Sequence, residues 1–211
     1  MVGSFLYYAR AIDNTIATAL NEIALKQSKP TETTNDKIDM LLNYLATYPN
    51  ARIRFYASDM ILYADSDAAY LISEGAKSRI AVYFYCSNKS TTTPPTPPLN
   101  APVHVECKFL RHVVTSAAEA ETAGLFLNSQ KVIEIKQMLE ALGHPQAATP
   151  IKTDNATAAS FVRDMLKQKR SKAWDMRYHW LSKQQNKKNF EIYWDKGVRN
   201  LADYHTKHHP P

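Results

Sequence analysis

The amino-acid sequence predicts an α/β protein in which a mixed β-sheet is flanked by helices and preceded by a helical segment. Three stretches rich in aromatic and β-branched residues follow one another without a helical pattern between them, at 60–70, 79–86 and 103–109. Strand-like and helical patterns then alternate from residue 117 onward. Consecutive strands of the first kind form an antiparallel meander, whereas the later alternation adds strands that are covered by helices.

Composition bounds the class of protein. The chain has 211 residues, of which 45% are hydrophobic, enough for one globular domain and an additional segment. It carries 26 Lys and Arg against 20 Asp and Glu, and this basic balance is compatible with a polyanionic partner. Cys86 and Cys107 lack Cys-x-x-Cys spacing, so we expect buried small side chains instead of a zinc site or disulfide. No apolar run approaches the roughly 18 residues of a membrane span and no signal-peptide layout is present, so we expect a soluble intracellular protein without a membrane partner.

Residues 1–52 are predicted to form a helical segment that carries no recognisable chemistry. Apolar residues recur at helical spacing within 5–25 and again from Ile38 to Leu45. Pro49 then ends the last of these helices. We interpret the segment as the end of a preceding domain and place a second domain over residues 53–209.

The sheet is predicted to begin with strands at 53–56 and 60–70, the second of which runs from apolar residues into acids. Further strands follow at 79–86 and 103–109, where β-branched and aromatic residues are frequent. The proline-rich stretch 88–102 between them is incompatible with a regular helix or strand. It is therefore predicted to be an exposed loop with partial polyproline character.

The remaining elements alternate between helix and strand. The longest helix is predicted over 117–142, because Gly143 and Pro145 supply a glycine stop followed by a proline. The later elements, in chain order, are a strand at 150–153, a helix at 156–167, a helix at 173–187, a strand at 190–194 and a short helix at 201–207.

Two acids near the start of the longest helix are predicted to have different roles. Ser116 followed by Glu119 is the pattern of a capping box, in which a hydroxyl and a carboxylate each accept a hydrogen bond from a backbone N–H of the first turn. Side chains two residues apart on a helix point about 200° away from each other, so only one of Glu119 and Glu121 can face a given site. Glu119 is therefore assigned to the cap, and Glu121 is a candidate metal ligand.

Four carboxylates occur where strands end or adjoining helices begin, and these are Asp67, Glu121, Asp154 and Asp203. Carboxylates that converge at the edge of a sheet repel one another unless a cation lies between them, and oxygen ligands suit Mg²⁺ or Mn²⁺. Two such ions, about 3.5–4 Å apart, activate water on one side of a phosphodiester and stabilise the leaving oxygen on the other. The pattern favours a nuclease.

Each of these acids also has a structural interpretation. Asp154 and Asp203 lie at helix-capping positions, where acids are common without any catalytic role. Asp65 and Asp67 share one face of a strand, so spacing alone does not choose between them.

A basic run at 167–172 precedes a helix that contains Trp174 and Tyr178. Such runs are usually solvated surfaces, but next to aromatic side chains they can bind phosphates. The candidate nucleic-acid contacts are Asn155, Lys169, Arg170, Lys172 and Arg177.

Five motifs together resemble the ribonuclease H domain at the C-terminal end of copia-type LTR-retrotransposon polyproteins. They occur in the order and on the elements expected of that family, at 66–70, 116–121, 153–155, 175–178 and 200–207. The resemblance covers roughly residues 55–209. Residues 2–9 and the helices behind them are similar to the end of the reverse transcriptase that precedes this domain in such polyproteins. No Tyr-x-Asp-Asp motif occurs, so polymerase activity is not expected of this fragment.

The resemblance implies a five-stranded ribonuclease H-like sheet, four carboxylates, two Mg²⁺ ions and cleavage of the RNA strand of an RNA–DNA hybrid. By motif, Asp67 matches the acid of Ser-Asp-Ala, which favours it over Asp65. Glu121 matches the second acid of Glu-Ala-Glu, Asp154 the acid of Asp-Asn, and Asp203 that of Leu-Ala-Asp. Asp67 would be shared by both ions, Glu121 and Asp154 would hold the ion that orients water, and Asp203 would complete the other.

The expected partners are an RNA–DNA hybrid and the reverse transcriptase portion of the same polyprotein, in the cytoplasm and within a virus-like particle if the element is active. Contacts to 2′-hydroxyls would distinguish RNA from DNA. Cellular ribonucleases H carry a histidine in the loop before the last acid, whereas 196–199 has none, and Arg199 or His205 are candidate replacements. The alternatives are an inactive hybrid-binding remnant and, less favoured, an integrase-like nuclease, whose set lacks a counterpart of Glu121.

Overall fold

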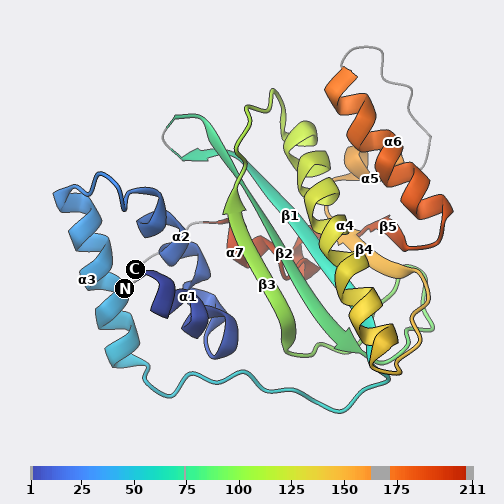
Figure 1. Cartoon of the computed structure of the whole chain (residues 1–211), viewed down its shortest axis with the longest axis horizontal. Coiled ribbons are helices and arrows are strands. Elements are labelled where there is room, and N and C mark those ends of the chain that lie inside the picture. Colours follow the sequence, from blue (N-terminus) through green and yellow to red (C-terminus); the bar gives the residue numbers. More distant parts are fainter. Residues whose placement is uncertain (1, 74, 163–171, 208–211) are drawn as a thin grey trace.

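The structure is a computed structural model and describes residues 2–73, 75–162 and 172–207. A twisted sheet lies at the centre, and a group of N-terminal helices lies beside it (Figure 1). None of the described helices has the length and apolar character that a membrane span requires.

The N-terminal segment is helical, as predicted. Its elements are α1 (Val2–Ala11), the 3₁₀ turn η1 (Asn14–Ile16), α2 (Ala17–Leu25) and α3 (Glu32–Thr47). The buried apolar side chains of these helices form a small core of their own, made of Ala9, Ile16, Leu20, Ile23 and Leu41. Because these side chains lie at helical spacing along the sequence, the pattern alone was sufficient to predict the helices.

The predicted strand at 53–56 is wrong. Residues 51–60 contain no helix or strand, and Phe55 and Tyr56 are each 60% exposed. The Tyr56 N–H donates to Asn100 Oδ1 at 2.9 Å, and its carbonyl accepts from Asn100 Nδ2 at 3.0 Å. Aromatic content favours a strand only where a partner strand is available, and here the Asn100 side chain takes up the backbone groups instead.

The five-stranded mixed sheet confirms the predicted fold class. Its strands are β1 (Ile61–Ser73), β2 (Lys77–Ser87), β3 (Pro102–Phe109), β4 (Thr149–Thr153) and β5 (Phe190–Trp194). Their order is β3-β2-β1-β4-β5. The first three strands form the predicted antiparallel meander, whereas β4 pairs in parallel with both β1 and β5.

Helices lie on the sheet as the alternating pattern predicts. They are α4 (Ala117–Ala141), α5 (Ala156–Val162), α6 (Lys172–Asn186), the 3₁₀ turn η2 (Gly197–Arg199) and the one-turn α7 (Asp203–Thr206). Gly143 adopts a φ of +90° just after α4, the left-handed conformation that a glycine stop provides. The predicted extension of α5 to residue 167 lies outside the described residues.

Alternation along β1 separates two faces of the sheet. Leu62 and Ala64 belong to the main core, in which Leu125 and Val132 of α4 also lie. The odd-numbered residues of this stretch, including Asp65 and Asp67, therefore point to the opposite face. That second face receives α7, which packs against β1 and β2.

The proline-rich stretch is largely exposed, as predicted, and it is fixed to the second face of the sheet. The Ser87 hydroxyl donates to the Pro98 carbonyl at 2.6 Å, and the Tyr83 hydroxyl donates to the Asn100 carbonyl at 3.2 Å. The Tyr193 hydroxyl contacts the Pro95 carbonyl at 3.5 Å. The loop thus supplies hydrogen-bond acceptors to tyrosines that would otherwise lie partly buried without partners.

Candidate active site

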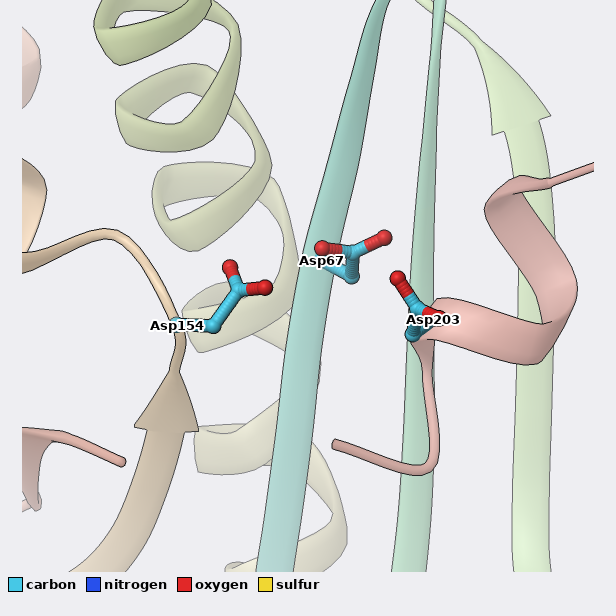
Figure 2. A group of neighbouring side chains, drawn as sticks. All are labelled: Asp67, Asp154 and Asp203. Atoms are coloured by element: carbon cyan, nitrogen blue, oxygen red, sulfur yellow. The ribbon is translucent and has the colours of Figure 1, made fainter. Parts of the chain in front are cut away.

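Three carboxylates meet beside the middle of β1, because the strand runs on to Ser73 and does not end at Asp67 as the sequence predicted. Asp67, Asp154 and Asp203 each place one oxygen within 4.8 Å of the others (Figure 2). The parallel register explains the first pair: Ala64 lies opposite Ile151, so Asp67 and Asp154, each three residues further on, lie level. Asp203 begins α7, which lies on the face of the sheet that Asp67 points to. We call these three residues the carboxylate trio.

Asp67 is buried within β1. Its Oδ2 accepts a hydrogen bond from the Thr206 hydroxyl of α7. Burial raises the pKa of Asp67 to about 6, the negative charges of Asp154 and Asp203 act in the same direction, and the Thr206 hydrogen bond opposes them. A carboxyl group in this state holds its proton more tightly than in water and gains from a nearby cation.

Glu121 lies next to the trio without being part of it. It is 5% exposed, and its Oε1 accepts from the Ala68 N–H at 3.3 Å. Its Oε2 is buried and has no hydrogen-bond partner among the described residues. Burial, followed by the charges of Asp67 and Asp154, raises the pKa of Glu121 well above its ordinary value. The structure thus brings three of the four predicted acids into one group and places the fourth within electrostatic reach.

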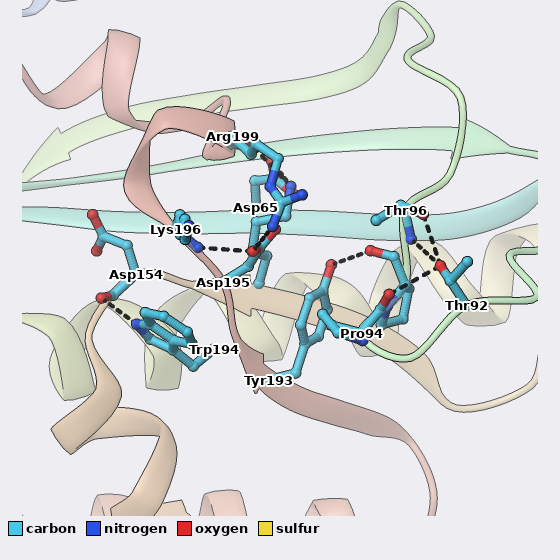
Figure 3. A network of polar contacts seen from close by, with 12 residues as sticks. Asp65, Thr92, Pro94, Thr96, Asp154, Tyr193, Trp194, Asp195, Lys196 and Arg199 are labelled. Carbon is cyan, nitrogen blue, oxygen red and sulfur yellow. Dashed lines mark hydrogen bonds and ion pairs between the residues drawn. The ribbon is translucent and has the colours of Figure 1, made fainter.

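Asp154 follows β4 directly and is only partly buried. Its backbone carbonyl accepts from the Trp194 indole N–H at 2.9 Å (Figure 3). Burial raises the pKa of Asp154, and the charge of Asp203 adds to the effect. A Cβ built on Gly197 would lie 2.6 Å from Asp154 Oδ2. Any larger residue at this position would therefore require the Asp154 carboxylate to shift.

Lys207 pairs with Asp203, with 2.6 Å between Nζ and Oδ1. This hydrogen bond raises the pKa of Lys207. Within the described part of the chain, the trio and Glu121 together set four carboxylates against this one ammonium group, so negative charge remains uncompensated. Thr206 and Lys207 belong to the C-terminal motif, but the sequence did not single them out. Their spacing of three and four residues from Asp203 on a helix is the signal that could have done so.

Asp65 has other partners, although it shares a strand face with Asp67. Its Oδ2 accepts from Lys152 Nζ at 3.0 Å and from the Leu201 N–H at 2.9 Å. Lys152 Nζ also donates to the Arg199 carbonyl at 2.8 Å. Asp65 and Lys152 therefore fasten the segment that leads into α7 to the centre of the sheet.

The cap of α4 forms with a changed partner. Ser116 Oγ accepts from the Glu119 N–H at 3.1 Å, as predicted. Glu119 Oε2 accepts from the Thr115 N–H and from the Thr115 hydroxyl, each at 2.7 Å, instead of from the Ser116 N–H. Glu119 thus has the predicted structural role.

Only some of the candidate nucleic-acid-binding residues lie in the described part of the chain. Lys169 and Arg170 lie outside the described residues, and Lys172 is placed only as part of α6. Arg177 is half-buried on α6. Asn155 Oδ1 accepts from the Ala158 N–H at 2.9 Å, which is a helix-capping contact.

The two candidate replacements for the missing loop histidine are engaged elsewhere. The Arg199 guanidinium donates to Asp195 Oδ1 (Figure 3). His205 is buried and its ring stacks on Tyr83, with 6.3 Å between ring centroids. Arg199 is the more accessible of the two, because 52% of its side chain is exposed.

No protein-family model matches the chain. At 25% identity over 208 residues it is similar to the retrovirus-related Pol polyprotein from transposon TNT 1-94 of Nicotiana tabacum. The match covers 98% of this chain and 15% of that polyprotein, so the chain spans a small part of its relative.

Solved structures share the fold at low identity. The foamy viral protease-reverse transcriptase in complex with dsDNA matches 95% of this chain and 38% of its own, at 13% identity and a TM-score of 0.51. The N-terminal RNase H domain of a Mycobacterium tuberculosis protein matches 70% of this chain and 91% of its own, at 10% identity and a TM-score of 0.47. LC11-RNase H1 in complex with an RNA/DNA hybrid matches 69% of this chain and 91% of its own, at 12% identity and a TM-score of 0.45. The chain shares the fold of part of the foamy viral protease-reverse transcriptase, and over nearly its whole length it is similar to a retrovirus-related Pol polyprotein of a transposon.

Proposed function

We propose that this chain is a ribonuclease H-type hydrolase that cleaves the RNA strand of RNA–DNA hybrids with the help of Mg²⁺ or Mn²⁺. The carboxylate trio, with one oxygen of each member within 4.8 Å of the others, carries the proposal. The similarity to a transposon Pol polyprotein supports a role in reverse transcription, next to the reverse transcriptase of a copia-type element. In such a role we would expect the chain in the cytoplasm, and within virus-like particles if the element is active.

The residues present fit a divalent cation. Glu121 Oε2 is a buried carboxylate oxygen without a hydrogen-bond partner among the described residues. The pKa values of Asp67, Glu121 and Asp154 are all raised, by burial first and also by neighbouring carboxylates, of which Asp203 acts on all three. A cation between these groups would relieve both effects, and ligand sets made of carboxylate oxygens are those that Mg²⁺ and Mn²⁺ prefer.

Asp67, Glu121, Asp154 and Asp203 would hold two such ions. In the view of Figure 2, Asp67 lies between Asp154 and Asp203, which supports the proposal that it would contribute to both ions. When bound, the ions supply an activated water and a stabilised leaving oxygen in the cleavage of a phosphodiester.

Other side chains prepare these ligands. The Thr206 hydroxyl holds the Asp67 carboxylate in a fixed orientation. The exposed Lys207 ammonium balances part of the charge of Asp203, and with cations bound it would be free to contact a substrate phosphate. The Trp194 indole fixes the backbone of Asp154, so the carboxylate projects from a rigid strand end.

Cleavage of a labelled RNA–DNA hybrid, with and without Mg²⁺, tests the proposal on native protein and on Asp154→Asn. We expect metal-dependent cleavage of the RNA strand, reduced in the variant by about 100-fold or more, as is typical for losing one electrostatic stabiliser of a transition state. Asp36→Asn, which changes an exposed acid of α3, should remain active.

The outcome separates the rival functions. Hybrid binding without cleavage by the native protein would identify an inactive remnant of a retroelement. Preferential cleavage of duplex DNA would identify an integrase-like nuclease. Either result would overturn the proposed ribonuclease activity.

A further inference from the structure

Helix α2 of the N-terminal segment contacts the helix that carries Asp203. The Thr18 hydroxyl donates to the His205 carbonyl at 3.0 Å, and both residues are buried. The Asn21 side-chain amide donates to the Cys107 carbonyl of β3 at 3.2 Å. In Figure 1, α2 faces β3 and α7, although both elements are far from α2 in the sequence. The N-terminal segment thus packs directly against the part of the sheet that supports the candidate active site.

Arg79 of β2 connects the two parts through charge. It is 0% exposed, and its Nη2 donates to Glu22 Oε1 of α2 at 2.7 Å. Its Nη1 donates to the Thr206 carbonyl at 3.1 Å, and its guanidinium lies 4.8 Å from the centre of the Phe109 ring. A buried guanidinium requires a counter-charge. Here α2 supplies that counter-charge to an arginine of the sheet.

The contacts continue from Arg79 to the carboxylate trio. The Thr206 hydroxyl donates to Asp67 Oδ2 and lies 3.0 Å from the Asp203 carbonyl. Helix α7 has only four residues, so it is too short to hold its conformation by its own hydrogen bonds. Its last two carbonyls are instead fixed from outside, by Thr18 and the Cys107 thiol at His205 and by Arg79 at Thr206.

We infer that Thr18, Glu22 and Arg79 are positioning residues for the candidate metal site: they fix α7 and thereby the separation of Asp203 from Asp67. The N-terminal segment is then part of the apparatus that binds metal, and not only a connection to a preceding domain. The inference deepens the proposed function and rests on it for the identity of the site. The contacts that carry it are independent of which reaction the site performs.

Mn²⁺ binding to the full chain without nucleic acid, measured by calorimetry, tests the inference. Glu22→Gln keeps the shape of the side chain but removes the charge that faces Arg79. We expect it to weaken Mn²⁺ binding by about 10-fold or more, as is typical when a group that orients a metal ligand is lost. Lys37→Met is the matched control, because Lys37 pairs with the other oxygen of Glu22 at 2.9 Å and is 49% exposed in its side chain. It should bind Mn²⁺ as the native protein does.

Two variants of Thr18 test the same inference without leaving a buried charge unpaired. Thr18→Val removes the donor to the His205 carbonyl, which keeps the Cys107 thiol, and should weaken Mn²⁺ binding by up to about fivefold, the value of one neutral hydrogen bond. Thr18→Ser retains the hydroxyl and should restore native affinity. This rescue distinguishes positioning from a general loss of packing.

Failure of the proposed function and failure of the positioning role give different results. If the native protein binds no Mn²⁺, the proposed metal-dependent function fails first. If the native protein binds Mn²⁺ and Asp154→Asn does not, while Glu22→Gln and Thr18→Val bind it normally, only the positioning role is overturned. A lower unfolding temperature with unchanged Mn²⁺ affinity would also overturn it, because the contacts would then stabilise the fold alone.

Discussion

Asp67 is almost inaccessible to solvent, and its neighbours are two further carboxylates and one hydroxyl group. Its ordinary pKa of 3.8 rises to about 6 because burial penalises the charged form. Protons would therefore compete with any cation for the same oxygens. If the carboxylate trio holds metal as proposed, it should bind it near neutral pH and lose it in acid.

The raised pKa predicts how stability depends on pH. A carboxyl group whose pKa is higher in the folded state stabilises the fold when the pH is below its pKa in the unfolded state. This contribution is lost as the pH rises through its pKa in the folded state. Metal-free protein should lose stability between about pH 4 and pH 7, by on the order of 3 kcal/mol for Asp67 alone. Asp67→Asn should remove that part of the pH dependence in urea unfolding followed at several pH values. Equal slopes for native protein and variant would contradict the prediction.

Gly197 gives a second prediction at the scale of one residue. Its φ is not in the left-handed region, so alanine is compatible with the backbone, but the added Cβ would meet Asp154 Oδ2 at 2.6 Å. Gly197→Ala should therefore displace the carboxylate and lower hybrid cleavage by up to about 100-fold, the cost of a misplacement near 1 Å. Gly3→Ala, where nothing lies within 4 Å of the new Cβ, is the control for kinetic assays. Full activity of Gly197→Ala would show that Asp154 tolerates displacement.

The elements around the site are held by contacts between segments that are distant in the sequence. Strand β1 supplies Asp65 and Asp67 on one face, and they serve separate purposes because their partners differ. Asp65 fixes the chain ahead of α7 through Lys152 and the Leu201 N–H, while Asp67 receives the Thr206 hydroxyl of α7 itself. The position of α7 thus depends on Asp65 and Asp67, two neighbouring residues on the same face of β1.

The buried pair of Asp65 and Lys152 yields a prediction at this scale. Lys152→Met leaves the Asp65 carboxylate buried without its ammonium partner, so it should destabilise the protein by about 3–5 kcal/mol. Adding Asp65→Asn should recover much of the loss, because the unpaired charge is then removed. Urea unfolding of both single variants and the double variant measures the coupling. Purely additive effects would show that the pair does not act as a unit.

At the scale of the whole molecule, polar contacts join the core of the N-terminal helices to the part of the chain that holds the main core. One core lies among α1, α2 and α3, and the other lies between the sheet and α4. Arg79 and Thr18 bridge them with buried hydrogen bonds that end at α7. The chain as a whole carries a net charge of +6, whereas the candidate site is locally acidic. A basic molecule with a locally acidic site agrees with the proposed nuclease, because the basic surface would attract a polyanion and the acidic site would hold cations.

The sequence by itself determined what short-range patterns encode. Helical spacing predicted the helices of residues 2–47, and alternating β-branched and aromatic residues predicted the five strands. The spacing of Ser116, Glu119 and Glu121 separated a capping acid from a candidate ligand, because the geometry of a single helix is sufficient for that decision. These predictions needed only neighbours a few residues apart.

Only the tertiary structure decided questions that depend on remote partners. It showed that 53–56 has no strand to pair with, that Asp65 is taken up by Lys152, and that Asp67 joins Asp154 and Asp203. It also provided the counter-charge of Arg79 from α2. Two acids on one strand face are equivalent in a sequence pattern, and they become different only when the chain brings a lysine to one and a hydroxyl to the other.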